Sequence, residues 1–344
     1  MEITKMNSEL KKLEQINQQL ENDGDWDRQK LLETNVIRES EEGVHRVGST
    51  SGPGQQLPFT RLYMPMASIG LLVPKKTVDD THCAIQILLP GTGTTFSIAE
   101  TLCDVAGTFH GRKSKNRGGG RKSNQSLITQ VSPDGQTFRV ASFPTDLPLN
   151  GMGAETPFEF ASEAGLVTVL RHVHLVLSCL YPNRPVFMAG RSQGGVAAIL
   201  YAQHYDDLAG AIAVNPPHPD PELFQFTVEY LESKAGVLAE LLHAPGVTLH
   251  DQSWEAYKTF TPKFNYPSKP SLSPILTLVS LGDPFNLFPQ YAHAQKEFAA
   301  SDEKNHLHIL DAGHNLWDRK SEETYQKVIN LQAQFMLSQM NKND

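Results

Sequence analysis

PVFMAGRSQGG, residues 185–195, is the stretch that decides the fold. It begins as a short apolar run typical of a strand and leads into VAAILYA, residues 196–202, which predicts a helix. Between them a G-x-S-x-G pattern sets Gly190 and Gly194 two residues before and after Ser192. A strand that turns abruptly into a helix strains its apex residue, and side chains at the flanking positions would collide with neighbouring elements. We therefore expect a sharp turn that projects the Ser192 hydroxyl clear of the sheet, beside the positive end of the helix.

An alternation of apolar strands and helices extends from this stretch in both directions. The predicted strands cover residues 84–89, 138–143, 186–189, 211–215, 275–281 and 307–310. The predicted helices cover residues 96–106, 160–180, 195–204, 289–300 and 321–340. Strands alternating with helices at these lengths predict an α/β fold with a doubly wound, mainly parallel sheet. Ahead of it, the apolar runs at residues 60–66 and 68–73 suit an antiparallel pair of strands.

Composition divides the chain into an N-terminal extension and a main domain that carries an insertion. Residues 1–43 predict a helical extension, with apolar residues at helical spacing over residues 3–20. With six basic and eleven acidic residues, this extension is an amphipathic helix that is folded back on the body or partly disordered, or else a short coiled-coil contact. Residues 44–344 form the main domain. Within it residues 216–274, rich in Phe, Leu, Tyr and Trp, predict a helical cap whose apolar face would exclude water and bind an apolar substrate group.

Charge and hydropathy argue against several classes of protein. A net charge of −8 over 344 residues disfavours a general nucleic-acid binder. The polar start predicts no secretory signal, and the best candidate for a membrane span, residues 164–180, is interrupted by Arg171, His172 and His174. The three cysteines are unpatterned, which is typical of reduced thiols in a cytoplasmic protein and predicts no zinc site.

The stretch from Arg112 to Lys122, RKSKNRGGGRK, carries six basic residues around three glycines. We interpret it as a solvated, flexible loop. The alternative is a weak contact with an anionic surface such as lipid headgroups, which would show as salt-sensitive binding. The glycines lack the spacing of a phosphate-binding loop.

A serine hydroxyl is a poor nucleophile unless a base takes its proton and a third group orients that base. The predicted strand at residues 307–310 is followed by Asp-Ala-Gly and then His314. A histidine just past the carboxyl end of a strand lies on the rim where open α/β sheets bind ligands, so His314 is the expected base. His306 and His308 share one face of that strand and form a metal pair by spacing alone, without an accompanying carboxylate or cysteine motif.

The acid is expected at the carboxyl end of another strand. Residues 275–281 run into Gly-Asp-Pro, a turn that fixes the carboxylate of Asp283. Asp283 is therefore the expected partner of the imidazole. Asp302 and Asp311 are the spare candidates, and Asp311 is too close along the chain to approach the imidazole readily.

Acyl transfer also needs hydrogen-bond donors for the developing oxyanion. The strand at residues 84–89 opens into PGTGTT, residues 90–95, where small residues let backbone N–H groups approach a substrate. The backbone N–H groups of Thr92 and Gln193 are the expected pair.

The chain order Ser192, Asp283, His314, with an oxyanion loop upstream, resembles the α/β-hydrolase family from about residue 60 to the C-terminus. The nucleophile motif stands here as GRSQG. The resemblance implies that the cap is inserted after the strand that follows the nucleophile's helix, and that FPTDLP, residues 143–148, forms the loop after the preceding strand. Many members have His-Gly in the oxyanion loop where this chain has Pro-Gly, a change that affects the shape of the loop more than its role.

The resemblance implies a carboxylic ester hydrolase, esterase- or lipase-like, that works through an acyl-enzyme on Ser192. Its substrate would be a small-molecule ester or lipid-like compound with an apolar acyl or alcohol part. Two alternatives stay open: an acyltransferase that uses the same triad, and a non-catalytic ligand-binding member of the fold. No metal, organic cofactor or nucleic-acid partner is expected, and the expected location is the cytoplasm.

Overall fold

The computed structural model describes residues 2–47, 55–74, 83–91, 128–131, 138–148, 160, 162–216, 269–283, 289–313 and 322–341. Several sequence predictions fall outside these stretches: the helix at residues 96–106, the basic stretch from Arg112 to Lys122, most of the cap (residues 217–268), Thr92 and His314.

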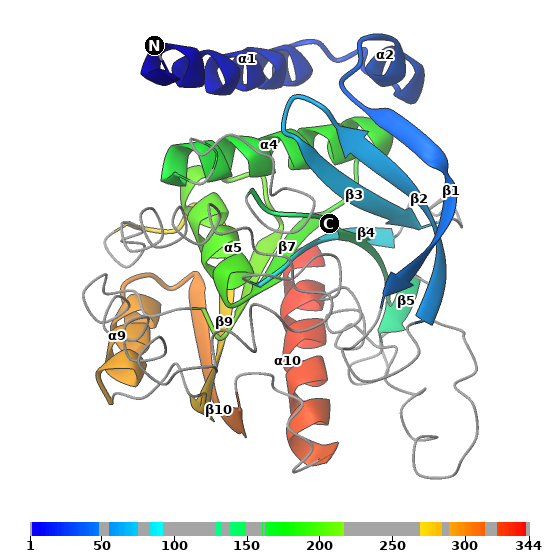
Figure 1. Ribbon diagram of the computed structural model, residues 1–344. Coiled ribbons are helices and arrows are strands. Elements are labelled where there is room, and N and C mark those ends of the chain that lie inside the picture. The colour runs from blue at the N-terminus through cyan, green and yellow to red at the C-terminus, as the bar shows by residue number, and fades with distance from the viewer. Residues whose placement is uncertain are drawn as a thin grey trace, which may run out of the picture.

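A seven-stranded sheet forms the centre of the described fold (Figure 1). Its strands are β4 (Cys83–Leu89), β5 (Ile128–Val131), β6 (Phe138–Pro144), β7 (Val186–Arg191), β8 (Gly210–Val214), β9 (Ile275–Gly282) and β10 (Asn305–Gly313). They lie in the order β10-β9-β8-β7-β4-β6-β5; β5 is antiparallel to its neighbour, and the other pairs are parallel. The predicted, mainly parallel α/β sheet is therefore confirmed. Strand β5, a four-residue edge strand, is an addition to it.

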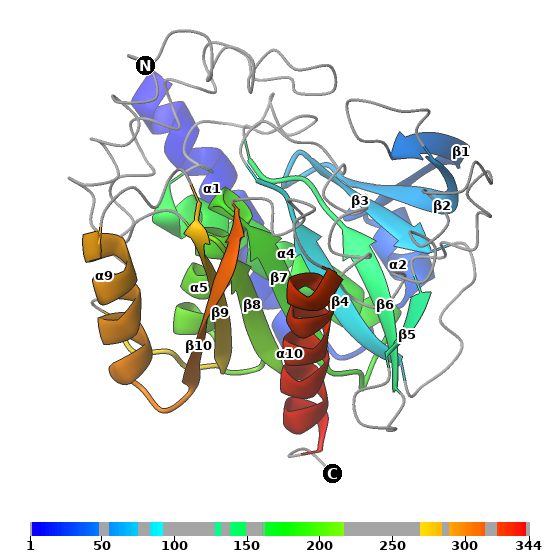
Figure 2. The ribbon, with the colours of Figure 1, turned by 90° about the horizontal axis from the view of Figure 1, so that it is seen from below.

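Helices cover both faces of this sheet, as Figure 2 shows. The described helices are α1 (Glu2–Asn22), α2 (Arg28–Glu33), α4 (Glu163–Leu180), α5 (Gln193–His204), α9 (Pro289–Ala300) and α10 (Glu322–Met340). Along β7, Met188 joins a core cluster with residues of α4 and α5, whereas Phe187 joins a second cluster with Val328 and Phe335 of α10. Successive residues of the strand are thus buried on opposite faces, which explains why β7 reads as a continuous apolar run.

Helix α4 is a core helix. By length and composition alone it could cross a membrane, but 61% of it is buried inside the fold, where it packs against α1 and α5. It begins at Ser162, whose hydroxyl accepts a hydrogen bond from the Gly165 N–H at 3.1 Å, an N-cap that satisfies one of the first-turn donors.

Helix α1 packs along α4. Its Leu13 and Leu20 are buried in the same core cluster as the apolar residues of α4. The Asn17 amide donates to the Thr168 carbonyl at 3.0 Å, and its oxygen lies 2.8 Å from Nδ1 of His172. Burial lowers the pKa of His172 to about 4, so the ring is neutral at physiological pH and its Nδ1–H donates to Asn17. These contacts favour the interpretation of the extension as a helix folded back on the body.

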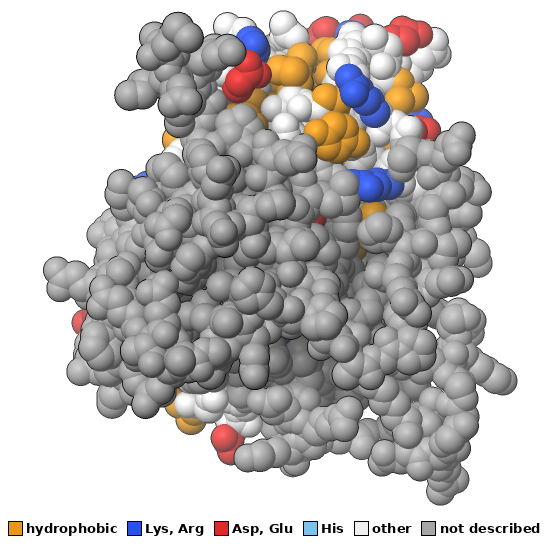
Figure 3. All heavy atoms as spheres, viewed as in Figure 1, with side chains coloured by type: hydrophobic (Ala, Val, Ile, Leu, Met, Phe, Trp, Pro, Cys, Tyr) orange, Lys and Arg blue, Asp and Glu red, His pale blue; other side chains and the backbone are white. Residues whose placement is uncertain are grey.

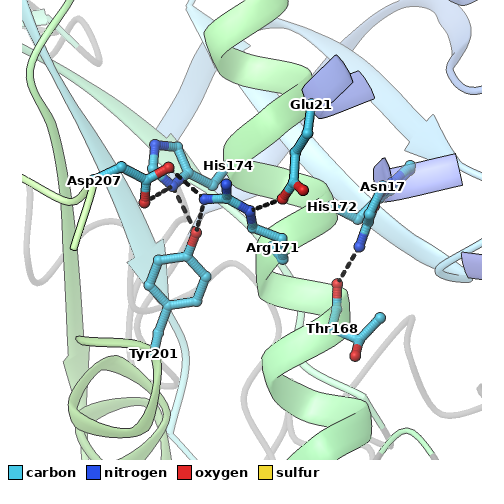
Figure 4. A network of polar contacts seen from close by, with 8 residues as sticks. All are labelled: Asn17, Glu21, Thr168, Arg171, His172, His174, Tyr201 and Asp207. Atoms are coloured by element: carbon cyan, nitrogen blue, oxygen red, sulfur yellow. Dashed lines mark hydrogen bonds and ion pairs between the residues drawn. The ribbon is translucent and has the colours of Figure 1, made fainter. Parts of the chain in front are cut away.

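A single guanidinium joins α1, α4 and the turn after α5 (Figure 4). Arg171 Nε donates to Glu21 at 2.6 Å, and its Nη1 donates to Asp207 at 2.5 Å and to the Tyr201 hydroxyl at 3.2 Å. The same hydroxyl lies 2.6 Å from Nδ1 of His174. Arg171 and the Nδ1 atoms of His172 and His174 thus have partners, which lowers the cost of burying them. Nε2 of His172 is buried without a hydrogen-bond partner in the described part of the chain.

A second, antiparallel sheet consists of β1 (Arg38–Val47), β2 (Gln55–Met64) and β3 (Ile69–Pro74). The apolar runs predicted to pair do pair, as β2 and β3. Strand β1 was not predicted, and the boundary expected at residue 43 falls inside it. At the top of Figure 3, where α1 and α2 lie in Figure 1, side chains of both charges lie beside apolar ones.

The two sheets meet where β6 ends. Thr145 forms an isolated antiparallel bridge with Leu71 of β3, and its hydroxyl donates to the Gly70 carbonyl at 3.0 Å. The next residue, Asp146, donates its N–H to the same carbonyl at 3.1 Å. Its side chain is fully buried, and neither carboxyl oxygen has a hydrogen-bond partner in the described part of the chain. Burial raises the pKa of Asp146 to about 8, against weaker attractions from Arg61 and the Gly70 N–H.

Replacing Asp146 by asparagine is expected to stabilise the protein in alkaline solution. The native state holds the Asp146 proton up to about pH 8, whereas the unfolded chain releases it near pH 4. The native state therefore binds more protons in this window, and the contribution of Asp146 to stability falls as the pH rises from about 4 to about 8. An amide of the same shape cannot ionise.

Denaturant unfolding of both proteins at about pH 5 and about pH 9 checks this prediction. At the higher pH the variant should have the larger free energy of unfolding, by at most on the order of 1.4 kcal/mol for each unit by which the pKa is raised. The difference in unfolding free energy between the two proteins should be smaller at the lower pH. A gap that is equal at both pH values would contradict it.

Candidate active site

The turn predicted around Ser192 lies at the carboxyl edge of the large sheet. Strand β7 ends at Arg191 and α5 begins at Gln193, so Ser192 alone connects them. Its backbone has φ 53° and ψ −122°, a conformation that residues other than glycine rarely adopt and that costs roughly 1–3 kcal/mol. The Ser192 N–H donates to the Val214 carbonyl of β8 at 2.9 Å, and its own carbonyl accepts from the Gly195 N–H at 2.9 Å. Both backbone groups of this partly exposed residue are thus held by neighbouring elements.

The glycines of the motif are required by close approach. A Cβ on Gly190 would lie 2.1 Å from the Gly194 carbonyl oxygen. One on Gly194 would lie 2.5 Å from the Leu89 carbonyl oxygen and 2.7 Å from that of Pro90. At Gly195, outside the motif, the nearest atom would be 3.3 Å away. The first turn of α5 therefore contacts both the end of β7 and the exit of β4, and only hydrogen fits at the two motif positions.

This close approach brings the exit of β4 to the N-terminus of α5. Gly91 is buried and is the last described residue of the predicted oxyanion loop; Thr92, the first expected donor, follows it outside the described residues. Gln193, the second expected oxyanion donor, is the first residue of α5. Its backbone N–H therefore lies at the positive end of the helix dipole. An anionic oxygen beside Ser192 would be stabilised by that end.

The predicted acid also lies at this edge. Asp283 directly follows β9, is 5% exposed, and donates its N–H to the Ser280 carbonyl at 3.2 Å. Strand β10 pairs in parallel with β9, and Gly313, its last residue, is in register with Gly282. The described backbone thus brings β10 to the edge beside Asp283. His314, the next residue along the chain, lies outside the described residues.

Asn215 links the end of β8 to β9 by two hydrogen bonds. The sequence analysis did not single out this residue. Asn215 follows β8 in a left-handed conformation, with φ 44°. Its amide donates to the Ser280 hydroxyl at 3.1 Å, and its oxygen accepts from the Ser280 N–H at 2.7 Å. Asparagine tolerates positive φ better than most residues, which is the one signal that sequence could have offered. The contact fixes the strand end that leads to Asp283.

Arg191 is the second residue that sequence reasoning missed. Its Nε is shut off from solvent. Burial lowers the pKa of Arg191 to about 10, while attraction to Asp283 acts in the opposite direction. A half-buried guanidinium, with its Nε shielded from solvent, thus stands at the end of β7.

The two histidines of β10, His306 and His308, have an aromatic ring and a lysine charge near them. The His306 ring lies 5.9 Å from the Phe335 ring, edge to face. Burial lowers the pKa of His308, and the charge of Lys327 and its neighbour His306 lower it further. Within the described stretches, no three His, Cys, Asp or Glu side chains lie close enough together to hold a metal ion.

The order of the strands, the helices on both faces and the strained serine between β7 and α5 together define the α/β-hydrolase fold. No protein-family model and no curated protein sequence matches the chain. Among solved structures, the proline iminopeptidase-related protein TTHA1809 from Thermus thermophilus is similar, with a TM-score of 0.53 at 16% identity over 88% of this chain and 99% of that one. The fold is therefore the one that the sequence predicted.

Two esterases are similar at a lower level. The Pyrococcus furiosus esterase Pf2001 has a TM-score of 0.49 at 12% identity, over 91% of this chain and 96% of that one. Est1E from Butyrivibrio proteoclasticus has a TM-score of 0.46 at 16% identity, over 79% and 95%. At these identities the likeness concerns the fold and leaves the activity to be argued from the site.

Proposed function

We propose that the chain is a serine hydrolase that cleaves carboxylic esters through an acyl-enzyme on Ser192. The observation that carries the proposal is the backbone of Ser192, held at φ 53° between a strand and a helix by glycines that admit no side chain. A strained backbone conformation persists only where the surrounding structure enforces it, and such conformations are frequent at functional sites. A partly exposed serine at the N-terminus of a helix supports the proposal, because its hydroxyl is accessible to the carbonyl carbon of a substrate.

The proposed reaction uses residues that the strand ends carry. Ser192 Oγ attacks the acyl carbonyl carbon while His314 takes its proton, and the Asp283 carboxylate orients and stabilises the resulting imidazolium. The backbone N–H groups of Thr92 and Gln193 bind the oxyanion. The imidazolium then protonates the leaving alcohol, and water activated by His314 attacks the acyl-enzyme and releases the acid. In support, Asp283 is buried at the same edge as Ser192, and β10 leads to His314 in register with β9.

We propose as substrate a small-molecule ester with an apolar acyl or alcohol part. The support is the composition of residues 216–274, rich in large apolar side chains, inserted directly after β8 at the carboxyl edge. An apolar wall over the serine would exclude water and strengthen the electrostatic steps.

A chain-length series of p-nitrophenyl esters tests the proposed function. We expect turnover of the acetyl ester, with kcat/KM rising as the acyl chain lengthens, by at most about fourfold per added methylene, because each buried methylene contributes about 0.8 kcal/mol. Identifying the products, with and without an added alcohol, separates hydrolysis from acyl transfer. Free acid as the main product supports the proposal, and a transferred acyl group would favour the acyltransferase. Inertness of the folded protein to the whole series and to a fluorophosphonate would favour a ligand-binding member of the fold.

A further inference from the structure

A path of hydrogen bonds joins the turn at Ser192 to the turn at Asp283. Strand β8 lies between β7 and β9 in the sheet (Figure 2). The carbonyl of Val214, the last residue of β8, accepts from the Ser192 N–H at 2.9 Å. The next residue, Asn215, makes two side-chain hydrogen bonds to Ser280 of β9. The Ser280 carbonyl in turn accepts from the Asp283 N–H at 3.2 Å. Two adjacent residues at the end of β8 therefore hold both turns.

Asn215 suits this place by its backbone and by its side chain. Its φ of 44° is left-handed, a conformation that asparagine adopts more readily than most residues. Its N–H donates to the Leu278 carbonyl at 2.8 Å, which extends the pairing of β8 with β9 by one residue. Its side-chain oxygen accepts from the Ser280 N–H at 2.7 Å, so its amide nitrogen faces the Ser280 hydroxyl, at 3.1 Å. Asn215 and Ser280 are both buried, which strengthens these hydrogen bonds.

The position of the Asp283 turn depends on where Ser280 is held. The two residues between them, Leu281 and Gly282, are exposed, so side-chain packing contributes little to fixing this segment. The N–H of Ser280 is held by Asn215, and its carbonyl holds the Asp283 N–H. A catalytic group that is misplaced by about 1 Å can lower the rate by roughly a hundredfold. A side chain that fixes Ser280 can therefore govern turnover from outside the triad.

We propose that Asn215 is a positioning residue that, through Ser280, holds the Asp283 turn at a fixed distance from Ser192. The inference rests on the proposed function, since this distance matters to turnover only if Ser192 and Asp283 act together. The end of β8 then serves two parts of the site. Its last carbonyl holds the backbone of the nucleophile, and the side chain that follows holds the strand end that carries the acid.

Two asparagine variants test the proposal. Asn215→Gly removes both side-chain hydrogen bonds and keeps a left-handed backbone without strain. Asn305→Ala is the matched control, because Asn305 is also buried but begins β10 at the opposite edge of the sheet. Its side chain likewise makes two hydrogen bonds, accepting from the Ser271 hydroxyl at 2.8 Å and donating to the Phe298 carbonyl at 3.1 Å.

For ester hydrolysis we expect Asn215→Gly to lower kcat by roughly tenfold or more with KM within about twofold. Asn305→Ala should leave both constants close to wild type, although both variants should lower Tm because each loses two buried hydrogen bonds. A kcat for Asn215→Gly equal to that of Asn305→Ala would overturn the proposal.

The same change in an Asp283→Asn background separates positioning from a general loss of structure. If Asn215 acts by placing the Asp283 carboxylate, its removal has little left to disturb once that carboxylate is gone. We therefore expect Asn215→Gly to change kcat by no more than about twofold in this background, against roughly tenfold or more in the wild type. An equal fold-loss in both backgrounds would overturn the proposal.

Thermal unfolding tests the contact itself without an activity assay. Asn215→Gly, Ser280→Ala and the double variant form a cycle, in which Ser280→Ala deletes only the hydroxyl. We expect the double variant to lose clearly less in Tm than the sum of the two single losses, because the two changes delete one shared hydrogen bond. Additive losses would overturn the contact. If Asn215→Gly does not fold, Ser280→Ala replaces it in the kinetic comparison, where its loss of kcat should disappear in the Asp283→Asn background.

The outcomes distinguish this proposal from the proposed function. Wild-type turnover that Ser192→Ala abolishes, together with equal losses for Asn215→Gly in both backgrounds, refutes the role of Asn215 alone. Absence of ester turnover in the folded wild-type protein refutes the proposed function, and the role of Asn215 in turnover with it.

Discussion

Replacing Ser192 by alanine is expected to lower the turnover of p-nitrophenyl esters by roughly a thousandfold or more. The change removes the one atom that forms the acyl-enzyme, while oxyanion binding and substrate binding remain. It also leaves the positive φ of residue 192 in place, so some strain persists, and alanine adds no atom to the turn. Steady-state kinetics of the purified variant, with circular dichroism as the check on folding, measures the effect.

Ser301→Ala is a suitable control for this variant. Ser301 lies in the turn after α9, where its hydroxyl donates to the Phe298 carbonyl at 2.6 Å. Its loss should cost the local hydrogen bond, about 1 kcal/mol of stability, and leave turnover unchanged. Residual activity of folded Ser192→Ala within tenfold of wild type would contradict the assignment of the nucleophile.

Replacing Gly194 by alanine is expected to break the turn. The added methyl would stand 2.5 Å and 2.7 Å from two carbonyl oxygens of the β4 exit, and neither belongs to a flexible side chain. The first turn of α5 would have to move away from β4, at a cost of about 3 kcal/mol or more, because overpacking a well-packed region forces the backbone to shift. Both Tm and ester turnover should fall. Differential scanning calorimetry and the ester assay check the two effects.

Gly195→Ala is the matched control, one residue along the same helix turn. Its added methyl would meet atoms no closer than 3.3 Å, and alanine favours the helical conformation by about 1 kcal/mol over glycine. The two effects oppose each other, so this variant should stay near wild type. Equal losses at positions 194 and 195 would contradict the account of the motif glycines as spacers between backbone segments.

The large sheet was predictable because its strands are buried on both faces and therefore read as apolar runs between helical stretches. Strand β4 illustrates this, since all seven of its residues are buried. Strand β1 was not predictable in the same way. Its sequence, RESEEGVHRV, lacks an apolar pattern, and its conformation is set by pairing with β2. Helix α2 ends at Glu33, and Asn35 turns the chain ahead of β1 with φ 58°.

Parts of the site depend on which side chains the register brings together, and local sequence does not contain that information. The motif glycines were predictable because a strand-to-helix turn has a fixed spacing. Asp146 belonged to a stretch assigned to a loop, and its full burial arises from the contact of two sheets. Arg191 stands in the variable position of the motif. Its half burial at the end of β7 depends on the packing of the sheet, which local sequence does not contain.

Mapping a fluorophosphonate adduct by mass spectrometry tests the central claim most directly. The reagent phosphonylates a serine only when a base activates its hydroxyl. The folded wild-type protein should carry one adduct, on the peptide that contains Ser192, and folded Ser192→Ala should carry none. A folded wild-type protein that stays unlabelled, or that is labelled on another residue with Ser192 unmodified, would contradict the account.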